Sequence, residues 1–310
     1  MKCSVIVACY NNTDLIKETL NSIDQQTYQE WELILVDDAS TDNTMEVLRQ
    51  YISSSLLQER YKLVSLPKNC GVSYAKGIGV LRSEGDIIVI CDHDDALTPN
   101  ALEEIVNMHK KYPNASIIYS QHYNCDPLLK PTGIAPSGQV MYSDILEDKI
   151  SHLLTYKRSC YDATSGYDSF FKIADDKDII YKLEEVGDVV FLEKPLYYFR
   201  ISSRGASQGH ENFNKSRDEK LIAVKNAIVR REKTLVRQIS SSSFTDFLAE
   251  HFLLQAEGYL LMNKPLNKKF IVSLLKAFYY RPGLNLKRKV KAALLLTRLK
   301  RGVLRALGRG

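Results

Sequence analysis

The stretch Asp86-Ile-Ile-Val-Ile-Cys-Asp92-His-Asp94-Asp95 joins a short apolar run to a cluster of acids. Its apolar residues, 87–91, predict a strand that is buried on both faces. Three carboxylates follow at the carboxyl end, where open parallel sheets bind their ligands. Carboxylates crowded in this way repel one another unless a cation lies between them, and oxygen ligands suit Mg²⁺ or Mn²⁺. An acidic turn that caps the next helix is the alternative interpretation of this motif alone.

Apolar strands and helical patterns alternate along the chain up to about residue 120. Five strands are expected, over residues 4–9, 32–36, 62–65, 87–91 and 116–119. Polar or glycine-rich turns follow these strands, and in a parallel sheet such turns gather at one edge. The alternation predicts an α/β fold with a doubly wound, mostly parallel sheet and helices on both faces.

The later part of the chain changes character. Prolines and glycines indicate a loop over residues 124–138, and two short strands are expected over 189–192 and 196–200. From residue 213 onward the pattern is helical, with candidate helices over residues 214–232, 243–263, 267–280 and 286–307. A helical C-terminal region, residues 213–310, is therefore expected to follow the α/β part.

The composition is typical of a soluble globular protein, with 45% hydrophobic and 25% charged residues. Six cysteines lie far apart and no pair has zinc-finger or redox spacing, so we expect reduced thiols in a cytoplasmic protein. No signal peptide is expected before the first strand. Every apolar run is shorter than the roughly 20 residues that a membrane span needs.

The C-terminal region is strongly basic. Residues 258–310 contain 14 Lys and Arg and no Asp or Glu, so the preceding residues carry −9 of the net charge of +5. A basic tail on an acidic body indicates an anionic partner. Residues 286–307 repeat apolar side chains at helical spacing among cations, as in helices that lie on anionic lipid. Packing on the rest of the protein is the alternative, and no nucleic acid is expected because few aromatic residues interleave the cations.

Six motifs of the chain, in order, resemble those of family-2 glycosyltransferases with the GT-A fold. The first four are Ser4-Val-Ile-Val-Ala-Cys-Tyr10-Asn11, Val36-Asp-Asp-Ala-Ser-Thr-Asp42, Asn69-Cys-Gly71-Val-Ser-Tyr-Ala75-Lys76 and Asp92-His-Asp-Asp95. The last two are Gly166-Tyr-Asp-Ser-Phe-Phe-Lys-Ile-Ala-Asp175-Asp176-Lys-Asp178 and Pro195-Leu-Tyr-Tyr-Phe-Arg200. The resemblance covers roughly residues 1–210. It implies a GT-A catalytic domain over 1–212, with a nucleotide-binding half, 1–120, and an acceptor and catalytic half, 121–212.

The resemblance also implies an activity. The chain is expected to be a metal-dependent, inverting glycosyltransferase that moves a hexosyl or N-acetylhexosaminyl group. The donor would be a nucleotide-diphosphate sugar, expected to be UDP-linked. The acceptor would be a glycan or lipid-linked glycan in surface polysaccharide synthesis. The basic tail agrees with a peripheral position at the inner face of the membrane.

Nucleotide contacts are implied for one set of residues: Ala8, Tyr10, Asp37, Asp38, Asn69, Gly71, Lys76 and Asp92. An acid at the end of the second strand accepts a hydrogen bond from a uracil N–H or a ribose hydroxyl. We favour Asp38 for this role, with a helix cap as the alternative. The family usually has Arg-Asn where this chain has Lys76-Gly77. Lysine keeps the charge but loses the bidentate fork of arginine.

Metal binding is implied for Asp94 and Asp92, which match the family's Asp-x-Asp motif. Mn²⁺ or Mg²⁺ held there would neutralise the charge that develops on the leaving diphosphate. Asp94 is the expected direct ligand, Asp92 is expected nearer the sugar or ribose, and Asp95 is expected to support them. The family often has a metal-binding His at the position of Ser202. Here His210 lies eight residues later, and it is the candidate substitute.

A general base is implied for Asp176, which must remove the acceptor proton as the oxygen attacks the anomeric carbon. The family pattern at this place is Glu-Asp, and this chain has the shorter pair Asp175-Asp176. Asp175 is the second candidate.

Three other classes of function fit the sequence less well. A non-catalytic nucleotide-sugar or glycan-binding module on the same fold would have lost its metal-binding and base acids, which are present here. A nucleotidyltransferase typically carries a Gly-rich, cationic loop after the first strand, where this chain has Cys9-Tyr-Asn-Asn12. An NAD dehydrogenase is excluded because no G-x-G-x-x-G follows that strand.

Overall fold

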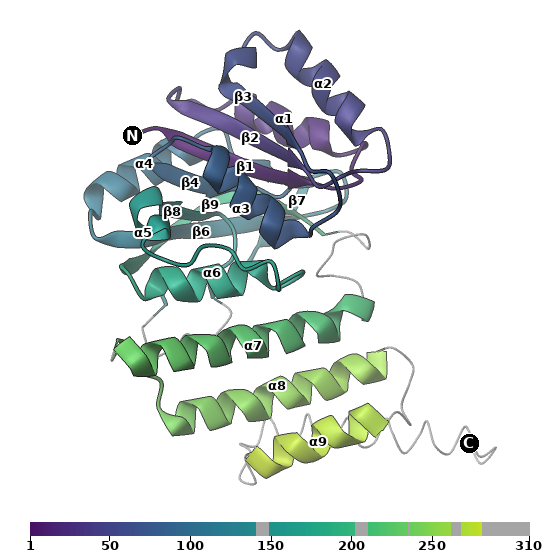
Figure 1. Cartoon of the computed structure of the whole chain (residues 1–310), viewed down its shortest axis with the longest axis vertical. Helices are drawn as coiled ribbons and strands as arrows, with labels where there is room; N and C mark the ends of the chain where they lie inside the picture. Colours follow the sequence, from purple (N-terminus) through teal and green to yellow (C-terminus); the bar gives the residue numbers. More distant parts are fainter. Residues whose placement is uncertain (141–148, 202–209, 235, 262–267, 281–310) are drawn as a thin grey trace, which may run out of the picture. The chain divides into compact units, whose positions relative to one another are not determined.

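The computed structural model describes residues 1–140, 149–201, 210–234, 236–261 and 268–280 (Figure 1). The chain divides into two compact units, Met1–Ser202 and Ser203–Gly310. The helix predicted over 286–307 lies outside the described residues.

The first unit contains one mixed sheet of nine strands among the described residues. The strands are β1 (Cys3–Cys9), β2 (Trp31–Asp37), β3 (Tyr61–Ser65), β4 (Ile87–Ile90), β5 (Ala96–Leu97), β6 (Ala115–Cys125), β7 (Pro131–Ile134), β8 (Leu154–Lys157) and β9 (Asp188–Arg200). Their order is β3-β2-β1-β4-β8-β6-β9-β5, and β7 pairs with β6.

The first four strands confirm the predicted parallel arrangement. Strands β3, β2, β1 and β4 pair in parallel.

Two features of the sheet are not predicted from the sequence. Strand β8 inserts antiparallel between β4 and β6, and the two strands expected over 189–192 and 196–200 form the single strand β9. Register shifts in the pairing of β9 with β6 mark the irregular place between its two apolar runs.

Six α-helices surround this sheet in the described part of the first unit. They are α1 (Ile16–Asp24), α2 (Thr44–Ser54), α3 (Val72–Arg82), α4 (Ala101–Lys111), α5 (Arg158–Asp162) and α6 (Asp175–Glu184). Helix α1 shows why the pattern folds this way, because Ile16, Leu20 and Ile23 recur at spacings of four and three and are all buried.

Helices cover both faces of the sheet, as the alternation predicts. Val5 and Val7 of β1 belong to one core cluster with buried residues of α1, α2 and α4. Ile6 points to the opposite face, where a Cβ on Gly79 of α3 would lie 2.4 Å from its Cγ2. Glycine therefore lets α3 approach β1 closely. Every residue of β1 and β2 is buried, and each large aliphatic side chain contributes about 1.5–3 kcal/mol by leaving water.

The parallel register places the strand ends together. Cys9 at the end of β1 is opposite Asp37 of β2, and Asp37 is opposite Ser65 of β3. Ile6 of β1 is opposite Ile90, the last residue of β4. The turns after these strands therefore meet at one edge of the sheet, which is where the functional motifs of the sequence lie.

The second unit is helical in its described part, as predicted. It contains α7 (His210–Thr234), α8 (Ser241–Leu261) and α9 (Lys268–Tyr280). A polar chain, buried at Gln255 and Ser273, joins the three helices: Gln255 Nε2 donates to the exposed Asp218 (2.7 Å), and the Ser273 hydroxyl donates to Gln255 Oε1 (2.7 Å). Within the described part of the chain, no helix combines the length and apolar character that a membrane span requires.

A buried glutamate ties the other edge of the sheet together. Oε1 of Glu32 accepts hydrogen bonds from the Ser4 hydroxyl (2.7 Å) and from the amides of Glu84 (2.6 Å) and Gly85 (3.1 Å). The ammonium of Lys62 lies 3.0 Å from Oε2. Burial alone would raise the pKa of Glu32, but these donors outweigh it and lower the pKa to about 2.

We predict that Glu32→Gln removes a pH-dependent part of the stability. The lowered pKa means that ionised Glu32 stabilises the fold above the ordinary pKa of 4.5, and that this stability disappears as the pH falls towards 2. The difference corresponds to about 3 kcal/mol. Urea unfolding between pH 6 and pH 3 measures the larger part of this loss, with the exposed Glu30→Gln as control. The same loss of stability with falling pH in wild type and Glu32→Gln would contradict the prediction.

Candidate functional site

The acidic motif forms the turn between β4 and β5, and β9 holds it in place. The amide of Asp92 donates a hydrogen bond to the Tyr197 hydroxyl oxygen (3.0 Å), and that hydroxyl donates to Oδ2 of Asp95 (2.9 Å). The amide of Arg200 donates to Oδ1 of Asp95 (2.7 Å). The buried Asp95 therefore binds the turn to β9, and through Tyr197 it holds the backbone of Asp92 in place.

The side chain of Arg200 extends this anchor to other elements. Its buried guanidinium donates from Nε to the carbonyl of Asp94 (2.7 Å), from Nη2 to Glu18 of α1 (2.7 Å) and from Nη1 to the carbonyl of Pro127. Arginine suits this place because its planar group carries five donors in fixed directions. The motif Pro195–Arg200, expected as the strand that closes the site, thus joins the acidic turn to α1 and to the loop after β6.

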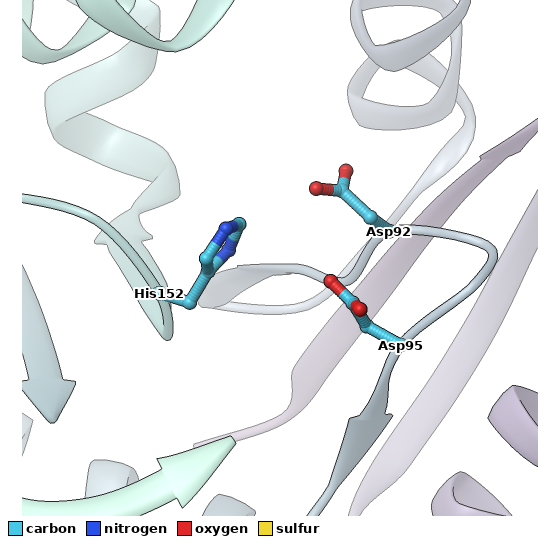
Figure 2. Close-up of side chains that lie close together, drawn as sticks. All are labelled: Asp92, Asp95 and His152. Carbon is cyan, nitrogen blue, oxygen red and sulfur yellow. The ribbon is translucent and has the colours of Figure 1, made fainter. Parts of the chain in front are cut away.

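Three side chains form a group that fits a divalent metal. One ligand atom each of Asp92, Asp95 and His152 lies within 4.8 Å of the others. Figure 2 shows the two carboxylates on the turn after β4 and the imidazole on the segment before β8, all facing one space. The His152 ring stacks on Tyr197 at 4.7 Å and on Phe199 at 4.9 Å between centroids. Two carboxylates and an imidazole are a donor set that Mn²⁺ accepts.

The electrostatics of the turn favour a cation. Burial raises the pKa of Asp95 well above its ordinary value, and the carboxylates of Asp94 and Asp92 raise it further. Burial is also the main cause of the raised pKa of Asp94. Burial lowers the pKa of His152, which favours the neutral imidazole that binds metals. A divalent ion would offset the repulsion among the acids.

Two residues that the sequence predicts as metal ligands, Asp94 and His210, are not in this group. Asp94 is half-buried and does not belong to the metal-fitting group that the described residues form. His210 begins α7 in the second unit, and its side chain lies outside the described residues. Metal binding by Asp94 and by His210 therefore stays a prediction.

Sequence reasoning missed His152 and Tyr197 as members of the site. His152 is an isolated histidine that lies 57 residues after Asp95 in the numbering, so no ligand spacing points to it. Tyr197 lies in the recognised motif of β9, and only the pairing of β9 with β5 brings it to the acidic turn.

The acids at the end of β2 organise the turns beside them. Oδ1 of Asp38 accepts the amide of Cys70 (2.7 Å), and Oδ2 accepts the amide of Gly71 (2.8 Å). Asp37 accepts more weakly from the amide of Ser40, at 3.3 and 3.4 Å. Both aspartates are buried. Asp38 thus holds the loop before α3 against the end of β2.

The other predicted nucleotide residues lie around these turns. Ala8 is buried in β1, Tyr10 just beyond it is 42% exposed, and Asn69 is exposed. Gly71 adopts φ +93°, and a Cβ there would lie 2.8 Å from Cδ of Lys172. Only glycine therefore suits this position. The exposed ring of Tyr10 is suited to stack on a base.

Lys76 connects the acidic turn with the expected catalytic segment. Its Nζ lies 3.3 Å from Oδ1 of Asp92 and 3.0 Å from Oδ2 of Asp175. Burial opposes ionisation of Asp92, yet Lys76 and two histidines lower its pKa to about 2. Burial dominates at Asp175 and, with the neighbouring Asp176, raises its pKa to about 6 against the attraction of Lys76.

The three acids at the start of α6 have different surroundings. Asp175 is buried against Lys76, and Asp178 is buried with its carboxylate 2.6 Å from the Lys182 ammonium. The side chain of Asp176 is 40% exposed and lies 3.0 Å from Lys177. Of these three carboxylates, Asp176 is the one that a substrate can reach.

The comparisons with known proteins agree with this geometry. The family model described as "Glycosyl transferase family 2" matches residues 4–159. The chain therefore belongs to glycosyl transferase family 2, and its fold is the GT-A fold predicted from the motifs.

Two relatives show how much of this chain and of a related protein can be aligned. The protein y4gI of Sinorhizobium fredii is 30% identical over 216 residues, which are 66% of this chain and 23% of that protein. The poly(ribitol-phosphate) β-N-acetylglucosaminyltransferase TarP of Staphylococcus aureus is 28% identical over 239 residues, 74% of this chain and 71% of TarP. The chain thus spans under a quarter of the first relative and most of the second.

Two solved structures share the fold. The S. aureus TarS fragment in complex with UDP-GlcNAc has a TM-score of 0.57 and 18% identity, over 92% of this chain and 93% of that one. The mannosyltransferase PcManGT of Pyrobaculum calidifontis, in complex with GDP-Man and Mn²⁺, has a TM-score of 0.54 and 18% identity. That match covers 99% of this chain and 86% of PcManGT.

We predict that the protein binds Mn²⁺ through Asp92 and His152. Asp92→Asn and His152→Ala should each weaken Mn²⁺ binding by at least about tenfold, because even residues behind the ligands typically contribute 10–100-fold. Titration calorimetry without nucleotide measures this, with the exposed Asp162→Asn as control and Asp94→Asn to test the ligand expected from the motif. Unchanged binding by both Asp92→Asn and His152→Ala would exclude this group as the metal site.

Proposed function

We propose that this chain is a metal-dependent, inverting glycosyltransferase that uses a UDP-linked sugar as donor. It would transfer a hexosyl or N-acetylhexosaminyl group to a glycan or lipid-linked glycan in surface polysaccharide synthesis. The observation that carries the proposal is the connected set of carboxylates: Asp92 of the metal-fitting group shares Lys76 with Asp175, which lies next to the accessible Asp176. The names of TarP and of the UDP-GlcNAc complex of TarS support the donor class.

The donor would bind along the edge formed by the strand ends. Tyr10 offers a ring to the base, and Asp38 fixes the loop of Asn69 and Gly71 beside it. Asp37 and Asp38 at the end of β2 would accept a hydrogen bond from a uracil N–H or a ribose hydroxyl in addition to the backbone amides that they already accept. Asp92, Asp95 and His152 would hold Mn²⁺ or Mg²⁺, which would supply positive charge for the leaving diphosphate.

Asp176 would act as general base. Its carboxylate takes the proton of the acceptor hydroxyl while that oxygen forms a bond to the anomeric carbon. The bond between this carbon and the diphosphate oxygen breaks in the same step, so the configuration at the carbon inverts. The accessibility of Asp176 supports this assignment over Asp175, which is buried and already paired with Lys76.

The alternative is a module of the same fold that binds nucleotide sugars or glycans without catalysis. It would bind UDP and leave UDP-sugars intact. The presence of Asp92 and Asp176 in a connected site favours the enzyme.

The C-terminal helices support a membrane partner for this enzyme. Helix α9 buries Phe270, Leu274 and Ala277 and exposes Ile271, Val272, Leu275, Phe278 and Tyr279. Lys268, Lys269 and Lys276 flank this exposed apolar face, and no acid occurs in residues 258–310. An apolar face edged by lysines suits an anionic lipid surface. We therefore propose that the protein works in the cytoplasm at the inner face of the membrane, where a lipid-linked acceptor lies.

We predict that Asp176→Asn abolishes transfer and leaves donor binding nearly intact. The amide has almost the same shape but cannot take the proton, and loss of a general base typically costs about 10²–10⁴ in rate. UDP release from UDP-GlcNAc in the presence of Mn²⁺ and an acceptor measures the rate, and calorimetry measures UDP affinity, which should change by less than about tenfold.

Asp175→Asn is the matched comparison for this prediction. If Asp175→Asn loses transfer while Asp176→Asn keeps it, the base is the preceding residue. If both variants keep transfer, the start of α6 is not the catalytic segment and the proposed mechanism is wrong.

We predict that the exposed face of α9 carries membrane binding. Leu275 is 64% exposed and Tyr279 is 78% exposed. Leu275→Glu and Tyr279→Glu should each reduce flotation with vesicles that contain anionic phosphatidylglycerol at low salt, because each substitution puts a negative charge on the apolar face. Leu56→Glu, at an exposed leucine of the first unit, is the control. Equal flotation of all three variants and wild type would contradict the assignment.

A further inference from the structure

Three contacts join the loop and helix on the donor side to the segment that leads into α6. The Ser73 hydroxyl donates to the carbonyl of Asp168 (2.7 Å), and Lys172 donates to the carbonyl of Cys70. The third is the ion pair of Lys76 with Asp175 at 3.0 Å. The first two involve backbone carbonyls, whereas Lys76 links side chains that belong to the proposed site.

The surroundings of Lys76 make it an internal counter-charge. The side chain is 7% exposed and lies between the carboxylates of Asp92 and Asp175. Helix α3 is close to the catalytic segment here, since a Cβ on Gly77 would lie 3.4 Å from Cβ of Tyr167. A buried ammonium with two carboxylate partners keeps one remaining donor. The two carboxylates already balance the charge of this buried ammonium, and loss of its pair with Asp175 would leave a buried carboxylate uncompensated, so the arrangement favours an internal counter-charge over a direct phosphate contact.

We propose that Lys76 is a positioning residue that sets the separation between the donor-side carboxylate Asp92 and the helix that carries Asp176. This inference rests on the proposed function, because it takes Asp92 as part of the donor and metal site and Asp176 as the base. It replaces the direct phosphate contact that the sequence motif suggests for Lys76. Lys76 acts through its partners: one carboxylate lies beside the leaving group, and the other is the immediate neighbour of the base.

The geometry gives this role a kinetic signature. An in-line displacement needs the acceptor oxygen and the anomeric carbon within about 3–3.5 Å, and a misplacement of about 1 Å can cost 10²-fold in rate. Loss of Lys76 removes the one of these three contacts that reaches α6 itself, so turnover falls while the proposed nucleotide contacts at the ends of β1, β2 and β3 remain. A direct phosphate contact would have the opposite signature, with weaker nucleotide binding.

The test compares Lys76→Met, Lys76→Arg and Lys182→Met. Lys182 is the matched control because it also forms a buried ion pair within α6, with Asp178, and its ammonium donates to the carbonyl of Gly166 in the catalytic segment rather than to the donor side. The readouts are kcat for UDP-GlcNAc hydrolysis with Mn²⁺, UDP affinity by calorimetry, and hydrogen exchange of the amides at the start of α6.

Lys76→Met is expected to lower kcat by about 10² or more and to change UDP affinity by less than about tenfold. Lys76→Arg, which keeps the charge and matches the usual residue of the family, is expected to restore kcat to within about tenfold of wild type. The start of α6 should exchange faster in Lys76→Met than in Lys76→Arg. Lys182→Met should lower the melting temperature with a smaller effect on kcat.

Three results would overturn the inference. The first is a loss of UDP affinity with unchanged kcat in Lys76→Met, and the second is an equal kcat loss in Lys182→Met. The third is unchanged hydrogen exchange of the amides at the start of α6 in Lys76→Met. This measurement needs no substrate, so its result stands even if UDP-GlcNAc is not the donor. Asp176→Asn measured in parallel separates the two proposals: if it keeps turnover, the proposed base is wrong whatever Lys76 does.

If Lys76→Met does not fold, the double variant Lys76→Met/Asp175→Asn removes both charges and leaves no buried ion of this pair uncompensated. Its kcat is expected to equal that of Asp175→Asn alone, because both variants break the same link. A further loss in the double variant would show that Lys76 acts independently of Asp175.

Discussion

Crowded negative charge at the end of β4 is the constraint on which the first unit depends. Asp92, Asp94 and Asp95 lie within one turn, and burial raises the pKa of the last two. An unpaired buried charge is costly, so such a turn persists only with compensation. Two cations from distant parts of the chain provide it. Arg200 of β9 donates from its backbone amide to the Asp95 carboxylate and from its guanidinium to the Asp94 carbonyl, and Lys76 of α3 pairs with Asp92. These contacts hold β9, α3 and α6 around the acidic turn, and a divalent ion at Asp92, Asp95 and His152 would complete the balance.

Local patterns in the sequence predict most of the parallel half of the fold. Strands β1 to β4 are apolar runs bounded by polar turns, and a parallel arrangement necessarily brings those turns to one edge. The same logic predicts that Asp38, Gly71 and Asp92 gather there. Strand β8 is different, because four residues between loops carry little periodic signal. Its antiparallel insertion depends on pairing with β4 and β6, which are distant in sequence. Non-local pairing of this kind also explains why His152 has no signature in the sequence.

The pairing of Lys76 illustrates the same limit within a recognised motif. The sequence motif shows that a cationic side chain, Lys76, stands at this position, but it cannot show which carboxylates that side chain pairs with. The structure gives it two carboxylates, one from each half of the first unit. This pairing separates the two acids of the catalytic segment. Asp175 becomes a buried partner of Lys76, and Asp176 keeps an accessible carboxylate. Two adjacent aspartates that look interchangeable in sequence therefore differ in the structure: one is buried and paired, and the other is accessible.

We propose that this set of carboxylates performs metal-dependent sugar transfer. The most direct measurement is a screen of nucleotide sugars for release of the nucleotide diphosphate, with Mn²⁺ and with EDTA. The account predicts release from a UDP-linked sugar in Mn²⁺ and its loss in EDTA. Tight binding of UDP without release from any donor would contradict it and would indicate the non-catalytic module. Full activity in EDTA would contradict the role of the metal.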